Sequence, residues 1–316
     1  MRRPASYPTP TYTDPRDRRL VSMVKGSEKA ATNAVNILGI PYDGAVLGRK
    51  GASEGPQGIR RAMRFFSNYS PELKQDLLKV RVVDIGDVVV GSDDVRKVHS
   101  DVKEEVWRAL SRSSMLVVLG GDNSLSLPSI AACSEKFGKV GLIVFDSHFD
   151  LREPMGGKPT SGSSYGTAVR TLDGMDGSRL VEVGIHGFLN SREYAEEAKK
   201  LRATVFTAGD VRKRGGASVA KRAYEIASRG ADVVYVSVDF DCLDISYVPG
   251  VSSPSAGGIS AIELLEMLHF LGGRSKVVCS DLVELAPPLD PTGKSEIVAA
   301  TALVSLMAGF AARSRR

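Results

Sequence analysis

Short apolar segments rich in β-branched residues recur along this chain, and longer segments with helical periodicity separate them. Continuous apolar character indicates strands that are buried on both faces, as in a parallel sheet, because a sheet with one wet face alternates apolar and polar residues. The pattern therefore predicts an α/β fold around a mostly parallel sheet of roughly eight strands. The candidate strands are Val35–Ile40, Arg81–Ile85, Met115–Leu119, Gly141–Phe145, Leu180–Gly184, Thr204–Thr207, Val233–Val238 and Lys276–Leu282.

Candidate helices lie between these strands. Right-handed crossovers between parallel strands place helices on both faces of a sheet, which predicts three α/β/α layers. Ser260 with Glu263 forms a capping-box pattern, which marks the start of one helix. His99 and His269 fall within helical patterns, and we interpret both as structural. The candidate helices are Asp94–Ser111, Ser191–Leu201, Ser218–Ser228, Ser260–Leu271 and Lys294–Phe310.

The alternation of strands and helices continues to the C-terminal helix without a low-complexity linker. A chain of 316 residues therefore suits one catalytic α/β domain, which we place at residues 31–316. Residues 1–30 are rich in proline at their start and predict an irregular arm over the surface of that domain.

The composition argues against several classes of protein. No apolar run approaches the ~20 residues that cross a bilayer, so we expect no membrane partner. The three cysteines form no Cys-x-x-Cys pair, which argues against a disulfide scaffold or zinc ribbon and favours a reduced, cytoplasmic setting. The net charge of +5 is dispersed, and no basic stripe is interleaved with aromatic residues, so we expect no nucleic-acid partner.

Acidic side chains, an amide and one histidine directly follow four of the candidate strands. They lie in Gly120–Ser124, Asp146–Asp150, Asp239–Asp244 and Val283–Glu284, each behind its own apolar run. The carboxyl ends of parallel strands share one edge of the sheet, and ligands of such sheets bind there. We therefore expect these segments to meet in one site.

The types of residue in these segments indicate a metal centre. Carboxylates that are packed together repel one another, and a divalent cation removes that repulsion. Asp146, His148 and Asp150 offer closely spaced ligands, and Asp239 and Asp241 repeat the spacing. An oxygen-rich set with one imidazole suits Mn²⁺ or a similar ion, and bridging carboxylates suit two ions about 3.5–4 Å apart. Because a lone Asp-x-Asp is usually a loop or a cap, the prediction rests on the joint occurrence of these segments.

The same segments resemble the arginase/agmatinase/formimidoylglutamase family, the ureohydrolases. The family's motifs Gly-Gly-Asp-His-Ser, Asp-Ala-His-x-Asp and Ser-x-Asp-x-Asp-x-x-Asp-Pro correspond to Gly120–Ser124, Asp146–Asp150 and Ser237–Asp244. Leu38–Gly44 and Gly51–Pro56 are similar to the family's first strand and the loop after it, so the resemblance covers most of the chain. It implies a three-layer arginase-like fold, a centre of two Mn²⁺ ions, and a homo-oligomer, commonly a trimer or a hexamer.

The resemblance also implies a role for each matching position. Two carboxylates would bridge the ions, and a hydroxide created by the ions would attack the carbon of an amidine or guanidine substrate. Glu284 would hold the cationic group of the substrate, and Asp150 would pass a proton to the departing amine. The implied metal positions are Asn123, the bridging Asp146 and Asp239, Asp150 for one ion, and His148 and Asp241 for the other, with Asp244 supporting the loop.

The chain departs from the family pattern in three places. Asn123 replaces the histidine of the first motif, and an amide oxygen is a weaker donor than imidazole. We therefore expect the first metal position to be loose, partly occupied or empty. Tyr165 replaces the histidine that often precedes Gly-Thr in agmatinases, so proton shuttling there would need tyrosine or water. Ile245 replaces the proline after the last motif, which should matter little.

The choice of substrate depends on the tail that the pocket accepts. The two carboxylates of N-formimidoyl-L-glutamate call for Arg or Lys beside the pocket. Arg152 follows the second motif and Arg170 follows Gly-Thr, so both should lie at the rim. These segments and Gly187–Ser191 resemble formimidoylglutamases, which release L-glutamate and formamide. The residues expected to contact the substrate are Arg152, Tyr165, Arg170, Asn190 and Glu284.

Three alternatives stay open at this point. Arg152 and Arg170 could form surface or intersubunit ion pairs, which are common and contribute little. The substrate could be agmatine or another guanidino compound. The substitutions at Asn123 and Tyr165 also fit a metal-poor, inactive homologue with a role in assembly.

Overall fold

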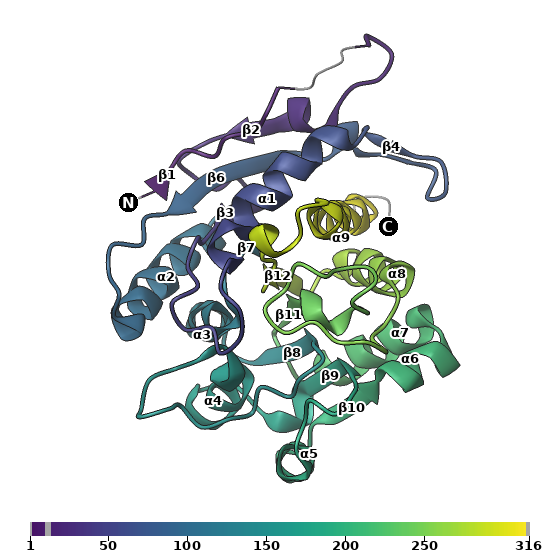
Figure 1. Cartoon of the computed structure of the whole chain (residues 1–316). Coiled ribbons are helices and arrows are strands. Elements are labelled where there is room, and N and C mark those ends of the chain that lie inside the picture. The colour runs from purple at the N-terminus through teal and green to yellow at the C-terminus, as the bar shows by residue number, and fades with distance from the viewer. Residues whose placement is uncertain (1, 10–13, 314–316) are drawn as a thin grey trace.

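The structure, a computed structural model, describes residues 2–9 and 14–313. Within these residues a sheet of ten strands has the order β1-β6-β3-β7-β12-β11-β8-β9-β10, with β2 paired to β6 beside this path (Figure 1). Its pairings are parallel apart from the antiparallel pair of β1 with β6. The strands are β1 (Arg2–Arg3), β2 (Val24–Gly26), β3 (Val35–Gly39), β6 (Val82–Val88), β7 (Met115–Leu119), β8 (Val140–Phe145), β9 (Leu180–Ile185), β10 (Thr204–Thr207), β11 (Val233–Asp239) and β12 (Val277–Val283).

Helices cover both faces of this sheet, which confirms the predicted three-layer α/β/α fold. One face packs against α1, α6, α7, α8 and α9, and the other packs against α2, α3, α4 and α5 (Figure 1). A separate hairpin pairs β4 (Tyr69–Ser70) with β5 (Gln75–Asp76). The helices are α1 (Gly55–Ala62), α2 (Val95–Leu110), α3 (Ser126–Phe137), α4 (Ser164–Thr171), α5 (Arg192–Lys200), α6 (Ala208–Arg214), α7 (Gly216–Ala227), α8 (Ala261–Gly272) and α9 (Lys294–Ala311).

The predicted count of roughly eight strands was wrong, because the sheet has ten. Each predicted strand is present, and the two further strands, β1 and β2, come from residues 1–30 and pair with β6. β1 has two residues and β2 has three, and neither forms an apolar run, so no hydrophobic pattern signals them. Pairing to the edge of an existing sheet creates these strands.

Helices α1, α3, α4 and α6 were absent from the sequence prediction. Glycine, proline and serine are common in turns, and they open α1 and α3, which hides both helices from a reading of the sequence. Proline is tolerated in a first helical turn because it lacks only an N–H that has no partner there. The predicted capping box of Ser260 and Glu263 is present at the start of α8.

The central strands are buried on both faces, as their continuous apolar character predicts. In β7, Met115, Val117 and Leu119 face one core, whereas Leu116 and Val118 face the other. The same alternation holds in β8 and β11. Each strand thus anchors both helical layers, so the ends of neighbouring strands are fixed relative to one another.

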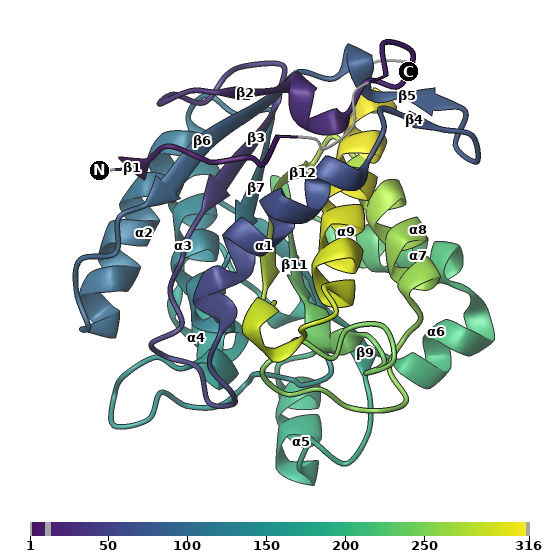
Figure 2. The same cartoon turned by 45° about the horizontal axis from the view of Figure 1, so that its top comes forward.

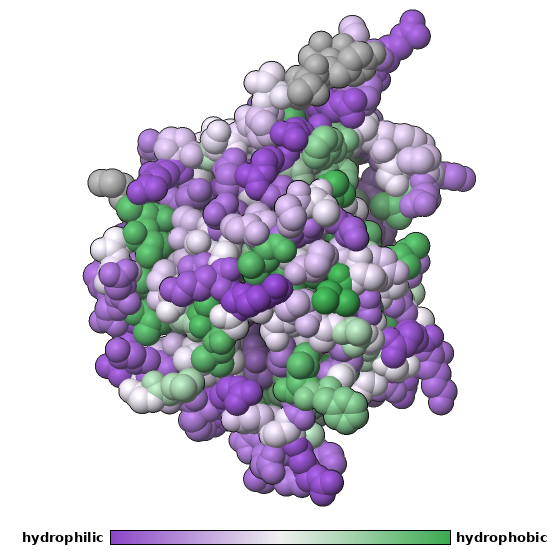
Figure 3. Space-filling model, viewed as in Figure 1, coloured by the Kyte–Doolittle hydropathy of each residue, from purple (hydrophilic) through white to green (hydrophobic). Residues whose placement is uncertain are grey.

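Helix α9 is long and apolar enough to cross a membrane by length and composition alone, and it is the one such helix among the described residues. Half of that segment is buried inside the protein. The helix lies between α1 and α8 (Figure 2). These contacts make α9 a core helix of the fold. Over the face seen in Figure 3, hydrophobic residues are scattered among hydrophilic ones.

A buried ion pair ties α1 to β6 near the edge of the sheet. The guanidinium of Arg60 donates from Nε and Nη2 to both oxygens of Asp84, at 2.8 and 3.0 Å, and from Nη1 to Asp87 at 2.6 Å. The side chains of Arg60 and Asp84 are fully buried, and Tyr7 of the N-terminal arm donates its hydroxyl to Asp84. The pair therefore joins the arm, α1 and β6.

We predict that Arg60→Ala lowers the free energy of unfolding by about 3–5 kcal/mol, because it leaves Asp84 buried without a counter-ion. Arg222→Ala, which removes an exposed ion pair with Glu225, should cost less than about 1 kcal/mol. Denaturant unfolding of both variants measures the difference. Equal losses in the two variants would contradict the role given to Arg60.

Candidate functional site

The sheet order brings the four acidic segments to one place. Strands β7, β12, β11 and β8 are consecutive neighbours in the middle of the sheet, and each ends at one of the predicted segments. A hollow of about 280 Å³ lies at these ends. Its lining includes His148, Asp150, Asp239, Asp241 and Glu284, so most of the predicted site residues meet in one cavity.

Three of the predicted ligand side chains are close enough to share one cation. Asp146, His148 and Asp241 each offer a ligand atom, and these atoms lie within 4.8 Å of one another. The Nδ1 atom of His148 is 3.0 Å from Oδ2 of Asp241 and 3.4 Å from Oδ1 of Asp146. The backbone N–H of His148 also donates to Asp146 Oδ1, which folds the segment after β8 inward.

Ser147 is a site residue that sequence reasoning missed. Its backbone N–H and its hydroxyl both donate to Oδ1 of Asp241, at 3.0 and 2.9 Å, and its Oγ is 3.0 Å from His148 Nδ1. These bonds hold the segment after β8 against the segment after β11. The other oxygen of Asp241, Oδ2, faces His148. The serine in place of the family's usual alanine was the signal that could have revealed it.

Asn123 is fully buried and held at both ends of its amide. Its Nδ2 donates to Asp150 Oδ2 at 2.6 Å, while its Oδ1 accepts from the hydroxyls of Ser126 and Tyr165 at 2.8 and 2.9 Å. The backbone N–H of Asn123 donates to Oε1 of Glu284 at 2.7 Å. The residue therefore positions two other site carboxylates by direct hydrogen bonds.

Two site residues adopt strained backbone conformations. Asp150 and Glu284 have φ angles of 49° and 64°, in the left-handed region that few non-glycine residues adopt. Such conformations persist where the surrounding structure enforces them. Gly121 lies so close to Tyr42 that a Cβ atom would overlap the tyrosine carbonyl oxygen, and its own carbonyl accepts from the N–H of Glu284. Only glycine fits there, and it fixes the position of Glu284.

The electrostatics of the cluster show strong repulsion among its carboxylates. Burial, followed by the charges of neighbouring carboxylates, raises the pKa of Asp146 and of Asp239 well above the usual range. Burial raises the pKa of Asp150 to about 6 and that of Glu284 to about 8. Burial alone would lower the pKa of His148, but Asp241 raises it to about 10. The cluster therefore holds protons unless another cation replaces them.

The donor set fits a divalent cation. Oδ2 of Asp146 and Oε2 of Glu284 are buried and lack a hydrogen-bond partner within the described part of the chain. Buried carboxylate oxygens without partners are costly, and metal coordination is one of the ways in which proteins satisfy them. Oxygen donors with one imidazole match Mn²⁺ and related ions. The residues that could hold such ions are Asn123, Asp146, His148, Asp150, Asp239 and Asp241.

The two predicted arginines differ in position. Arg152 lines the hollow, and its guanidinium stacks 5.0 Å from the centre of the Tyr194 ring. Arg170 is not part of that lining among the described residues, and it bonds to Glu153 and Glu197. Arg170 also donates to the backbone carbonyl of Arg152 at 3.1 Å. Arg170 thus lies behind Arg152 and supports its loop.

Tyr165 and Asn190 also lie behind the lining. Tyr165 is fully buried, and its hydroxyl is 3.0 Å from Oγ of Ser237 in addition to its bond with Asn123. The amide of Asn190 donates to the carbonyl of Ser147 at 2.7 Å and accepts from the N–H of Phe149 at 3.1 Å. Both residues hold neighbouring segments in place, so their direct contact with a substrate stays a prediction.

Other parts of the lining had no signal in the sequence, because they are small or apolar residues on separate loops. These additional lining residues are Leu47, Gly48, Ser161, Gly162, Leu189, Ser252 and Ser253.

Two residues outside the lining have supporting contacts. The carboxylate of Asp244 accepts from the N–H groups of Ser246 and Gly257, as a supporting role for its loop requires. His99, interpreted as structural, bonds to Ser124 Oγ at 3.1 Å, and burial lowers its pKa to about 4.

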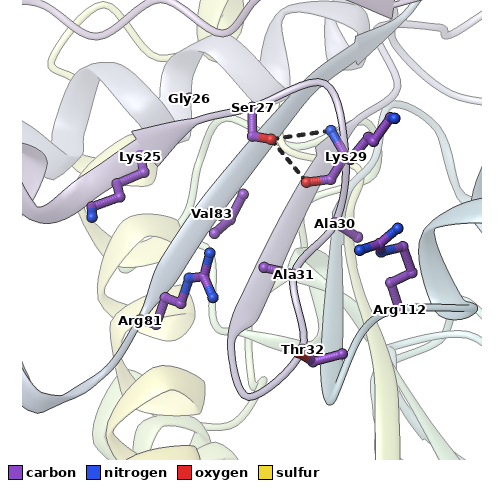
Figure 4. Close-up of a pocket in the computed structure, with 10 residues that line it drawn as sticks. All are labelled: Lys25, Gly26, Ser27, Lys29, Ala30, Ala31, Thr32, Arg81, Val83 and Arg112. Carbon is purple, nitrogen blue, oxygen red and sulfur yellow. Dashed lines mark hydrogen bonds between the residues drawn. The ribbon is translucent and has the colours of Figure 1, made fainter.

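A second hollow of about 340 Å³ lies around the connection between β2 and β3 and shares no residue with the acidic one (Figure 4). Four cationic side chains line it, and none of its described lining residues is acidic. In Figure 4, Lys25 and Arg112 lie on opposite sides of the segment from Lys29 to Thr32. Since the cationic side chains are exposed and spread apart, this hollow is not a candidate for the catalytic site.

A three-layer α/β/α fold with a cluster of carboxylates and one histidine at the carboxyl edge of its sheet fits a metal-dependent enzyme. The model of the Arginase family matches residues 33–309, and the chain belongs to this family. Its members are ureohydrolases, which hydrolyse C–N bonds in amidines and guanidines, and the chain is an enzyme of this type.

The similar proteins include enzymes of two substrate types. The formimidoylglutamase of Halalkalibacterium halodurans is 34% identical over 280 residues, which cover 88% of each chain. An agmatinase of Neisseria meningitidis serogroup C is 33% identical over 86% of this chain and 85% of its own.

Solved structures show the same fold. The formimidoylglutamase of Bacillus subtilis superposes with a TM-score of 0.89 at 28% identity, covering 95% of this chain and 94% of its own. The formiminoglutamase of Trypanosoma cruzi, solved with Mn²⁺, has a TM-score of 0.85 at 29% identity and covers 94% of this chain and 99% of its own.

We predict that Asn123→His raises the affinity for Mn²⁺ at least about tenfold, because imidazole is the stronger donor. Metal analysis after dialysis and titration calorimetry measure the stoichiometry and the affinity. Asn33→His, which changes an exposed asparagine outside the hollow, is the matched control. An unchanged affinity in Asn123→His would contradict the proposed place of Asn123 at a metal position.

We predict that the metal-free protein loses stability as the pH rises from about 5 to about 8. The folded state binds more protons than the unfolded state in this range, because the pKa of Glu284 rises from 4.5 to about 8 and that of Asp150 from 3.8 to about 6. Unfolding of chelator-treated protein measures the trend. Glu284→Gln should reduce the fall in the free energy of unfolding by up to about 1.4 kcal/mol per pH unit. A free energy of unfolding that increases with pH over this range would refute the prediction.

Proposed function

We propose that the enzyme is a formimidoylglutamase, which hydrolyses N-formimidoyl-L-glutamate to L-glutamate and formamide. The observation that carries this proposal is the position of Arg152. It is the one Arg or Lys side chain among the described residues that line the acidic hollow. A guanidinium at this place attracts a carboxylate tail and repels the ammonium tail of agmatine.

The surroundings of Arg152 support a role in binding a carboxylate. Tyr194 stacks on its guanidinium, and Gly162 leaves room for its side chain, since a Cβ at that residue would lie 2.9 Å from Arg152 Cδ. Arg170 neutralises Glu153 and Glu197 and holds the backbone of Arg152. Arg152 itself therefore remains available to an anionic ligand.

The side chains of the hollow account for the steps of the reaction. Glu284 accepts from Asn123 through Oε1, which leaves its buried Oε2 to accept an N–H of the amidinium group. By the resemblance to ureohydrolases, the carboxyl group of Asp150 would deliver a proton to the departing nitrogen. When bound, divalent ions would supply Lewis-acid polarisation and lower the pKa of water.

Two Mn²⁺ ions, a homo-oligomer and a cytoplasmic setting belong to the same proposal. The acidic donor set and the Mn²⁺ in the Trypanosoma cruzi formiminoglutamase support manganese. The three cysteines are free and buried, which is compatible with a reducing compartment. The resemblance to ureohydrolases supports a trimer or a hexamer.

Agmatinase is the second candidate function, and the similarity to agmatinases of Neisseria meningitidis favours it. The hollow contains enough carboxylates to accept a cationic tail if its ions leave one of them free. The two functions differ in their products, because agmatine yields urea and putrescine. A substrate panel with Mn²⁺ therefore separates them.

We predict that Arg152→Ala raises the KM for N-formimidoyl-L-glutamate about tenfold to a hundredfold, because a hydrogen bond to a charged group contributes about 1.5–3 kcal/mol. The value of kcat should change little, because Arg152 contacts the tail rather than the reacting carbon. Steady-state kinetics of formamide release measure both constants.

Arg192→Ala is the matched control, because Arg192 is exposed at the start of α5 and outside the hollow. An unchanged KM in Arg152→Ala would contradict the proposed role of Arg152 in binding a carboxylate. A substrate panel in which agmatine alone is hydrolysed would favour the second function, and the absence of turnover with bound metal would favour an inactive homologue.

A further inference from the structure

A histidine outside the predicted site joins two loops of the pocket rim. His186 directly follows β9, and its Nε2 is 2.6 Å from Oγ of Ser255 in the segment after β11. Its Nδ1 is 2.7 Å from the carbonyl oxygen of Gly184. Because that carbonyl can only accept, Nδ1 carries the proton, and Nε2 accepts from the serine hydroxyl.

The backbone at Gly184 makes this arrangement possible. Its φ angle is 104°, in a region that favours glycine, and a Cβ there would lie 3.2 Å from the carbonyl of Asp146 and 3.3 Å from Cβ of Cys242. The strand therefore turns at its end beside the metal-ligating segments. This turn presents the carbonyl to His186 and fixes the tautomer of the imidazole.

The loop that contains Ser255 is held at two ends. At one end, Arg49 donates to the carbonyls of Val251 and Ser252, at 2.6 and 3.4 Å. At the other end, Asp244 accepts from Gly257 and His186 accepts from Ser255. Ser253, which lines the hollow together with the anchored Ser252, lies between these anchors.

The loop that begins at His186 also reaches the hollow. Leu189 lines it, and Asn190 holds the segment of Ser147 and Phe149 through two hydrogen bonds. The bond between His186 and Ser255 therefore connects the two rim loops that flank the acidic cluster. Phe188, in the loop that begins at His186, is fully exposed and does not contribute to this link.

We propose that His186 is a positioning residue, which fixes the Ser252–Ser253 edge of the pocket by accepting the hydroxyl of Ser255. Ser252 and Ser253 line the hollow but are outside the acidic donor set, so the contact should affect the affinity for substrate more than the chemical step. The proposal rests on the proposed function for its kinetic consequences. The link between the loops is a separate property, which can be measured without substrate.

Kinetics of the Mn²⁺-loaded enzyme test the link with paired variants. Ser255→Ala and His186→Phe should each raise the KM for N-formimidoyl-L-glutamate about fivefold to tenfold, with kcat within about twofold and unchanged metal content, and the double variant should equal either single variant. Ser255→Thr, which keeps the hydroxyl, should restore the parent KM. His269→Phe, the same substitution in helix α8, is the matched control.

Hydrogen exchange supplies the readout that is independent of activity. In the parent, the N–H of Ile245 bonds to the carbonyl of Ser255 and the N–H of Gly257 bonds to Asp244. Both amides should exchange about tenfold faster in Ser255→Ala and in His186→Phe, but not in Ser255→Thr. Unchanged exchange would overturn the proposal. Faster exchange together with no turnover of this substrate by the parent would keep the link and reject the proposed function.

Discussion

Repulsion among buried carboxylates is the constraint on which this site depends. The sheet order places the ends of four central strands side by side, and each end contributes an acidic segment. Burial of these groups raises the pKa values of Asp146, Asp150, Asp239 and Glu284, so the cluster without an added cation holds protons. Packing of the fold must therefore offset the burial and repulsion of these carboxylates. The central strands, which are buried on both faces, supply such packing.

Much of the fold could be predicted from the sequence, because fully buried strands produce unbroken apolar runs. The edge strands β1 and β2 could not, since they exist only through pairing with β6 and have no apolar pattern of their own. Helix α1 was hidden by glycine and proline in its first turn, and α3 by serine and proline, although proline is tolerated in a first helical turn. The interior of the sheet was thus more predictable than its edges and connections.

The acidic part of the site was predictable for a similar reason. Charged residues directly behind apolar runs must lie at the ends of strands, and parallel strands bring those ends together. Sequence alone did not separate Arg152, which lines the hollow, from Arg170, which supports it from behind. It also gave no sign that His186 and Ser255 meet, because their contact depends on loop paths rather than on a periodic pattern.

The side-chain amide of Asn123 can occupy its site in two orientations. A half-turn about its last side-chain bond would exchange the oxygen that faces Tyr165 and Ser126 with the nitrogen that faces Asp150. Hydroxyl groups accept as readily as they donate, so both neighbours would tolerate the exchange without any shift of the backbone. The oxygen would then oppose Asp150 and the carbonyl of Ser161, an arrangement that is unfavourable unless a proton or a cation lies between them. The orientation of this amide is therefore linked to the charge beside Asp150.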